Sequence, residues 1–345
     1  MYVLVLRNRE PVSYGEESVG IKTMIKRISI LLPERGDIVQ VPIILGNGIR
    51  GVLRDIMTYV FLEKVAEKAE SKNKSVNVDA RALLLMLTGG VLRRRGDEQV
   101  TARSIDNLRK RIEVLLPLSI MGFALSNVMI PSKIKISVFY PVCSETYQLI
   151  QDLIDKVKDK IEVNFDSLKQ VSVKNLIEEV QMMHKDDVSK LASITLPNLK
   201  LINISESDSI RGRQVQETTE QEEESRASQG QERVRARLQA IFQREYVLPG
   251  TVFIGFISEI VPLNDAEKEL LALSVKRIEE SSGVGGAVAR GFGSFSIEYS
   301  DLDNLVTSSN ESKLDKFIEE KLCDILNALN SNPEDWLMSS QTSNP

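Results

Sequence analysis

The sequence lacks most of the features that common enzyme classes require. Among its 345 residues there is one histidine, His184, and there are two cysteines, Cys143 and Cys323, whose spacing matches no metal-binding or disulfide pattern. GxSxG, HExxH and paired-cysteine motifs are absent. We therefore expect His184 to be structural, both cysteines to be buried free thiols, and the protein to hold no catalytic residue, metal or cofactor.

Long apolar runs are also missing. No segment approaches the roughly 18 uncharged apolar residues that a membrane-spanning helix needs. The N-terminal stretch MYVLVLRNRE becomes charged before a signal-peptide apolar region could form. These absences predict a cytoplasmic protein without a membrane partner.

Positive charge is not in excess, because 44 Lys and Arg stand against 49 Asp and Glu, for a net charge of -5. The acidic residues concentrate in the segment 217–224 and in later helical segments, whereas the first 135 residues contain basic clusters. Screening limits exposed charges to a range of about 10 Å, so a local basic face can coexist with an acidic total. The clusters are Lys22, Lys26 and Arg27; Arg93, Arg94 and Arg95; and Arg109, Lys110 and Arg111.

The amino-acid composition is that of a globular protein, with 42% hydrophobic and 27% charged residues. No fixed-period repeat is found, and strand-like segments alternate with helix-like ones, which predicts one large α+β domain. The polar segment 205–235 predicts a mobile loop or a helix ordered only by a partner. Residues 301–345 are expected to form a C-terminal helix and a tail that frays from Ser331.

Hydrophobic periodicity places the elements along the chain. Strands are expected at 2–6, 21–32, 39–45, 133–140, 246–257 and 294–299. Helices are expected from Gly46, at 104–115 with Pro117 as its end, at 144–160, around His184, at 265–280 and at 314–326. Residues 15–18 read as a turn.

The first notable motif is GNGIRGVLR at residues 46–54. A helix that starts here presents unpaired N–H groups and a positive dipole end, which suit a phosphate at Asn47 and Gly48. Arg50 and Arg54 are four residues apart, so we expect both on one face, opposite the apolar stripe. The alternative is a glycine turn with two solvated arginines, since a Walker lysine is missing.

A second glycine motif spans residues 283–293 and includes Gly285, Gly286 and Arg290. It runs into a strand rather than a helix, which disfavours a dinucleotide-binding fold. The spacing allows a backbone poor in side chains to lie against a polyanion with Arg290 as its cation; the alternative is a turn before a buried strand. The loop cations Arg93, Arg94 and Arg95 and the strand residues Lys133 and Lys135 could extend such a surface, although charge runs are usually just solvated.

GNGIRGVLRD and GGAVARGFGSF together resemble the two glycine motifs of the repeat-associated RNA-binding (RAMP) superfamily of CRISPR systems. The stretches LLMLTGGVLRRR, IEVLLPLSIMGFALSNVMIPSKIKISVFYPVCSET and YVLPGTVF are most similar to the repeating backbone subunit of type IV effectors, with other class 1 backbone subunits as looser relatives. The resemblance covers most of residues 1–300.

This resemblance implies an RNA-recognition-motif (ferredoxin-like) core with an inserted finger at about 65–130 and a thumb at about 185–245. Many copies would polymerise into a helical filament along one guide (CRISPR) RNA in a prokaryotic effector complex with other subunits. The guide would then pair with target DNA or RNA. Gly46, Asn47, Arg50 and Arg54 would contact guide phosphates, and Gly285, Gly286, Arg290 and Gly291 would form the second loop. The acidic 205–235 segment departs from the family.

Relatives in type III systems cut target RNA with an aspartate in the loop after the first strand, where a carboxylate can hold a metal. Here that loop offers Glu16, Glu17 and the distant Asp37. We therefore expect a non-catalytic scaffold; the alternatives are a metal-dependent RNA endonuclease and a nucleotide-binding protein. The expected RNA-binding residues are Lys22, Lys26, Arg27, Asn47, Gly48, Arg50, Arg54, Arg93, Arg94, Arg95, Lys133, Gly285, Gly286 and Arg290.

Overall fold

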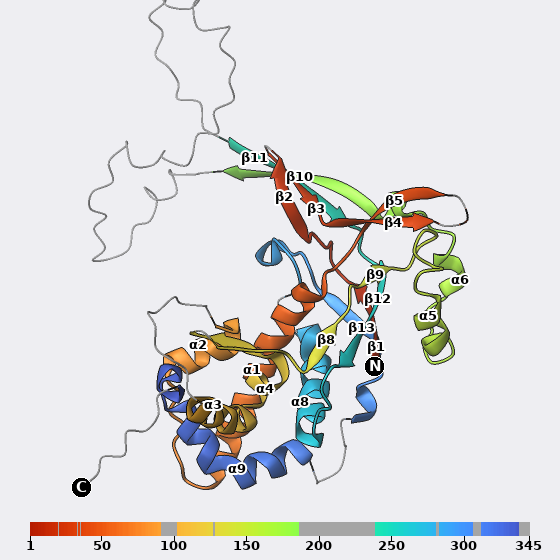
Figure 1. Ribbon diagram of the computed structural model, residues 1–345. Coiled ribbons are helices and arrows are strands. Elements are labelled where there is room, and N and C mark those ends of the chain that lie inside the picture. Colours follow the sequence, from red (N-terminus) through yellow and green to blue (C-terminus); the bar gives the residue numbers. More distant parts are fainter. Residues whose placement is uncertain are drawn as a thin grey trace, which may run out of the picture.

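The computed structural model describes residues 1–19, 21–32, 34, 36–90, 102–126, 128–185, 239–280, 283–305 and 312–337. Helices and mostly antiparallel sheets share the described chain (Figure 1), which confirms the α+β prediction. No helix among these residues is both long and apolar enough to cross a membrane. The 205–235 segment and Arg93, Arg94 and Arg95 lie outside the described residues.

A five-stranded sheet forms the centre of the molecule. Its order is β13 (Phe295–Ser300), β1 (Tyr2–Asn8), β12 (Val252–Glu259), β8 (Ile134–Ile136), with β9 (Tyr140–Pro141) also paired to β12. All of these pairs are antiparallel. The run VLVL in β1 is apolar at every position because both faces of the sheet are covered: Leu4 and Leu6 enter one core cluster, Val3 and Val5 the other.

The larger core cluster joins the sheet to a helical lobe, which we define as the helices to the left of and below the sheet in Figure 1. These are α1 (Gly46–Ser71), α2 (Ala80–Thr88), α3 (Ala102–Val114), α4 (Leu116–Met121), α8 (Asp265–Lys276) and α9 (Lys313–Leu329). Helix α1 buries Ile49, Leu53, Met57 and Val60 at helical spacing. Helix α8 begins at a capping box of Asn264 and Glu267 and packs against α1. The short hairpin β6 (Phe123–Leu125) and β7 (Val128–Ile130) follows α4.

The smaller core cluster lies under α5 (Gln151–Val157) and α6 (Phe165–Leu168) on the opposite face of the sheet. A second sheet has the order β10 (Ile177–Lys185), β11 (Gln239–Val247), β3 (Lys22–Ile25), β2 (Gly15–Val19). Beside it stands the hairpin β4 (Arg27–Leu32) and β5 (Asp37–Pro42). Single 3-10 turns complete the chain: η1 (Val173–Leu176), η3 (Arg277–Glu280), η4 (Val288–Arg290), η5 (Asp303–Leu305) and η6 (Pro333–Trp336).

Several expected elements are wrong, and pairing explains why. Residues 15–18 belong to strand β2, which pairs with β3. The segment around His184 is strand β10 because it pairs residue for residue with β11, so tertiary contacts override its local helical pattern. The stretch 21–32 divides into β3 and β4, which lie in different sheets. Pro117 lies in the first turn of α4, where its missing N–H costs nothing.

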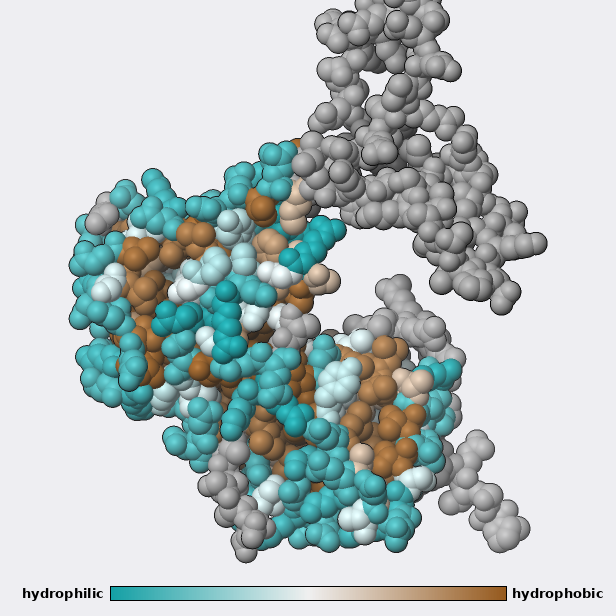
Figure 2. Space-filling model, turned by 180° about the vertical axis from the view of Figure 1, so that it is seen from behind, coloured by the Kyte–Doolittle hydropathy of each residue, from teal (hydrophilic) through white to brown (hydrophobic). Residues whose placement is uncertain are grey.

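The C-terminal region and the cysteines also differ from expectation. Ser331 does not begin a frayed end: Trp336 in η6 is 1% exposed, and its indole N–H donates to Ser331 Oγ at 2.7 Å. Cys143 is buried as predicted, whereas Cys323 is exposed on α9. On the face seen in Figure 2, apolar surface is divided into separate patches by hydrophilic side chains, so hydropathy alone marks no single binding surface there.

Candidate nucleic-acid interface

The two glycine motifs, which are separated by more than 220 residues in sequence, meet at one cleft of about 520 Å³. Figure 1 shows the second glycine loop (blue) beside the start of α1 and strand β2. We call this the glycine cleft. Six of its nine lining residues are glycines; the lining is Tyr14, Gly15, Gly48, Gly51, Val52, Arg244, Gly283, Gly285 and Gly286.

Backbone hydrogen bonds to residues 11–13 hold the second glycine loop in place. Gly286 N–H donates to Ser13 O at 2.8 Å, and Gly293 N–H donates to Pro11 O at 2.9 Å. Gly285 has φ +103°, a conformation that favours glycine, and a Cβ there would lie 2.9 Å from Ser13 O. The loop is therefore seated on the segment that follows β1, which places it opposite α1.

Two arginines supply the charge of the cleft. Arg244 on β11 donates from Nη1 to Ser13 Oγ at 3.3 Å. Burial lowers its pKa, and the positive charge of nearby Arg290 lowers it further. Within the described residues neither arginine has an acidic partner. The cleft thus holds uncompensated positive charge, which an anion would neutralise.

Tyr14 forms the wall of the cleft beside α1. A Cβ at Gly48 would lie 2.5 Å from Tyr14 Cε2, so glycine at this position makes room for the ring. Burial raises the pKa of the Tyr14 phenol, while the charge of Lys26 acts in the opposite direction. Asn47 is exposed at the start of α1. The structure therefore brings the predicted residues Lys26, Gly48, Gly285, Gly286 and Arg290 to the cleft or its edge.

Arg54 does not lie opposite the apolar stripe of α1, contrary to the sequence-based expectation. It is 8% exposed, and its Nη2 donates to Met121 O at 3.1 Å and to Gly122 O at 2.9 Å. Half-buried Arg50 also donates to Met121 O. Burial, and then the charge of Arg50, lowers the pKa of Arg54 to about 10, so the guanidinium stays charged at neutral pH. Both arginines clamp the end of α4, and Gly89 packs against the Arg54 guanidinium.

Lys22 on β3 and Arg27 on β4 both form ion pairs with a carboxylate of β11. Lys22 Nζ lies 3.1 Å from Glu245 Oε1 and also pairs with Glu179; Arg27 Nη2 lies 2.8 Å from Glu245 Oε2. Burial raises the pKa of Glu245, but the hydrogen bonds from Lys22 and the Ile25 N–H and the two positive charges bring it below its usual value. These cations join β3 and β4 to β11.

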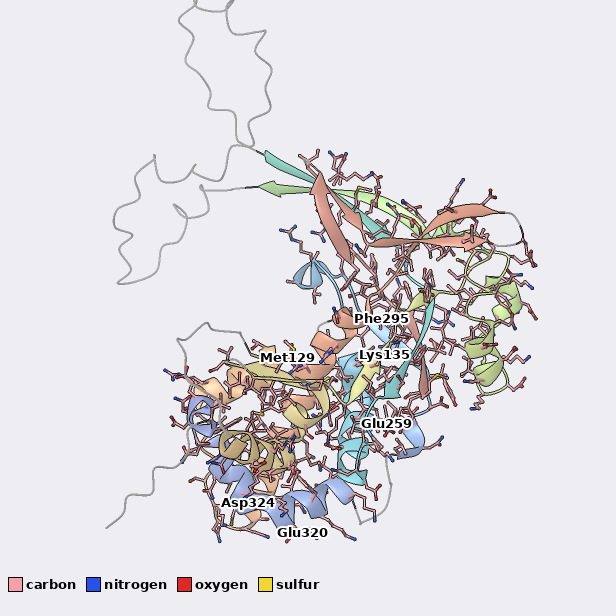
Figure 3. All side chains as sticks on the ribbon, viewed as in Figure 1. Met129, Lys135, Glu259, Phe295, Glu320 and Asp324 are labelled. Carbon is pink, nitrogen blue, oxygen red and sulfur yellow. The ribbon has the colours of Figure 1, made fainter. Side chains whose placement is uncertain are left out.

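Lys133 is also paired, so the expected wet basic face of its strand is wrong at this position. Its Nζ lies 2.6 Å from Oε1 of Glu267, a carboxylate that is 1% exposed and accepts a further hydrogen bond from Ser119. Lys135 is exposed on β8, beside β12 with Glu259 (Figure 3).

Lys133 lines a larger cavity of about 990 Å³ between α3, α8 and α9. The positive and negative charges that line this cavity are equal in number, so the cavity does not favour a polyanion. Asp324, one of its lining residues, lies with Glu320 on α9, at the far side of the helical lobe from the glycine cleft (Figure 3). The charged lining residues are the bases Lys110, Arg111, Lys133 and Lys321 and the acids Glu113, Glu267, Asp324 and Asp335.

Some predicted residues stay untested, and others were missed. Arg93, Arg94 and Arg95 lie outside the described residues and remain predictions. Arg244, Tyr14 and Gly51 were not expected in the site. The strand predicted from the sequence begins at Tyr246 and therefore leaves Arg244 outside. The alternation of polar and apolar residues in QREYV is the signal that could have extended this strand to include Arg244.

An α+β protein with a cationic, glycine-lined cleft is consistent with a protein that binds a polyanion, and the comparisons define its family. The model of the RAMP superfamily matches residues 15–296. The chain belongs to the RAMP superfamily.

A solved chain described as "Type IV-B CRISPR Complex" has a similar fold, with a TM-score of 0.50 and 13% sequence identity. The match covers 91% of this chain and 96% of that chain. No curated protein matches the sequence.

Proposed function

We propose that the protein is the guide-RNA-binding backbone subunit of a CRISPR effector complex of the type IV kind. The observation that carries the proposal is the convergence of both glycine motifs and Arg244 on one cleft, with Arg290 nearby. Neither arginine has an acidic partner among the described residues. Phosphate contacts of this kind give affinity without sequence choice and leave base edges free to pair with a target. Membership of the RAMP superfamily supports this assignment.

We further propose that the central sheet is an RNA-recognition-motif (ferredoxin-like) core. Its elements β1, α1, β8, β12, α8 and β13 follow the order β-α-β-β-α-β, with antiparallel neighbours in the order β13-β1-β12-β8. In this arrangement α1 and α8 cover one face. The finger and thumb would be the insertions at about 65–130 and 185–245.

The proposed assembly contains several copies of the chain along one guide RNA, together with other effector subunits, and the guide pairs with target DNA or RNA. The likeness to a chain of a type IV-B CRISPR complex supports this arrangement. We propose a non-catalytic scaffold, because the segment Gly15–Val19, which carries Glu16 and Glu17, forms strand β2 and contains no aspartate. Incubation with guide, complementary RNA and magnesium should yield no regularly spaced cuts.

The RNA-binding proposal is tested by the double substitution Arg244→Ala with Arg290→Ala. We expect the Kd for single-stranded RNA to rise roughly tenfold or more, equally across sequences, because two phosphate contacts are lost. The slope of log K against log salt should fall in magnitude by about 1.4, at about 0.7 per contact for a single strand. Fluorescence anisotropy at several salt concentrations measures both quantities.

The matched control is Lys110→Ala with Lys321→Ala, which removes two cations from the charge-balanced cavity. This variant should bind RNA like the unchanged protein. An unchanged Kd and salt slope for the Arg244 and Arg290 variant would contradict the proposal.

A further inference from the structure

Gly51 is a glycine that no contact within the described protein explains. A Cβ built on it meets nothing within 4 Å, and its φ is not positive. Every other glycine of the two motifs has an internal reason: a Cβ there would lie within 2.9 Å of another atom, or the residue has a positive φ. Those residues are Gly46, Gly48, Gly283, Gly285, Gly286, Gly291 and Gly293.

Glycine at this position also has a cost. Gly51 lies in the second turn of α1, where glycine in place of alanine destabilises a helix by roughly 1 kcal/mol. The position is exposed, so alanine would fit without strain. Its place in the lining of the glycine cleft is the feature that separates Gly51 from other exposed positions of α1.

The wall across the cleft is cationic. A Cβ at Gly286 would lie 2.8 Å from Arg244 Nη1, so this glycine allows the guanidinium to rest on the second loop. Gly51 and Val52 on α1 face the same cleft as Arg244. Among the described residues, no acidic side chain lines the cleft. A ligand placed there would have bare helix on one side and positive charge on the other, which suits a phosphodiester chain.

We propose that Gly51 is a steric gate of the glycine cleft: the missing side chain lets a backbone phosphate of a single-stranded RNA lie between α1 and Arg244. Gly51 contributes space rather than a hydrogen bond, because its N–H is already inside the helix. The inference rests on the proposed RNA-binding function and adds a position that limits how closely the strand approaches.

The test is a size series, Gly51→Ala and Gly51→Leu, measured for binding to single-stranded RNA and for thermal unfolding. Gly51→Ala should raise the Tm by about 1–3 °C through helix propensity while raising the Kd for RNA about threefold. Gly51→Leu should raise the Kd roughly tenfold or more. A gain in stability together with a loss of binding is a result that damage to the fold cannot produce.

The control is Ala66→Leu, which adds the same side chain at an exposed position of α1 about 22 Å further along the helix. It should leave the RNA affinity unchanged. If Gly51→Leu binds RNA normally while the Arg244 and Arg290 variant does not, the gate is wrong and the RNA-binding proposal stands. If both bind normally, both proposals are wrong. If Gly51→Leu changes only the oligomeric state in light scattering, the cleft receives a second copy of the chain, and the gate is wrong.

Discussion

The glycine cleft and the second sheet both contain basic residues, but their cations have different surroundings. Lys22 in the sheet and Arg27 on the neighbouring strand β4 share the buried carboxylate of Glu245, whereas Arg244, the residue before it on β11, faces the cleft with Arg290 nearby. Side chains of consecutive strand residues point to opposite faces. Glu245 therefore faces the cations that it neutralises, while the uncompensated charge of Arg244 lies on the other face of the strand. A basic cluster in sequence is therefore evidence of a polyanion site only once its acidic partners are known.

The largest expected effect on stability concerns a third group of cations, Arg50 and Arg54, which donate to the backbone at the end of α4. Arg54→Met should reduce the free energy of unfolding by about 3 kcal/mol, because the buried carbonyls of Met121 and Gly122 lose a charged donor. Urea unfolding followed by circular dichroism measures the change. Arg50→Met is the control, with about 1 kcal/mol expected from its single, half-buried contact. Wild-type stability of Arg54→Met would show that Arg54 is not structural.

Glu245→Gln is expected to have a smaller effect, about 2 kcal/mol of stability at pH 7, because it leaves Lys22 and Arg27 without their shared carboxylate. The pKa of Glu245 is lower in the folded protein than its usual value. Its contribution is therefore fully present above about pH 4.3, the ordinary pKa of Glu, and is lost as the pH falls through the lower folded pKa.

The difference in unfolding free energy between wild type and Glu245→Gln should accordingly shrink on acidification below about pH 4. Glu178→Gln on β10 is the control, since this exposed carboxylate accepts a hydrogen bond from Tyr246 Oη and from no other described residue. A difference that stays constant from pH 7 to 3 would show that the charge of Glu245 does not matter.

The smallest expected effect is that of Lys22→Ala on RNA binding. Because Glu179 and Glu245 already compensate the charge of Lys22, its removal should change the Kd for single-stranded RNA less than about twofold. Anisotropy under the conditions used for the double substitution of Arg244 and Arg290 makes the two variants comparable. A loss as large as that of the double substitution would contradict the distinction between the sheet and the cleft.

Local patterns predicted the elements that a single segment can specify. The apolar run of β1, the helical spacing from Ile49 and the start of α8 were all readable from neighbouring residues. Strand β10 was not, because its state depends on pairing with β11, more than 50 residues later in the chain. Trp336 was assigned to a frayed end for the same reason: its burial depends on Ser331 and on helices distant in sequence.

The two glycine motifs, the alternation of strands and helices and the family resemblance can be recognised from the sequence by itself, because they depend on residue type and short spacing. Only the tertiary structure decided which charges are uncompensated. Electrostatic compensation depends on distances of a few ångströms between side chains, and folding set Glu245 beside Lys22 and Arg27 and Glu267 beside Lys133. The same folding left Arg244 in the glycine cleft with Arg290 nearby, and none of the described residues in the lining is acidic.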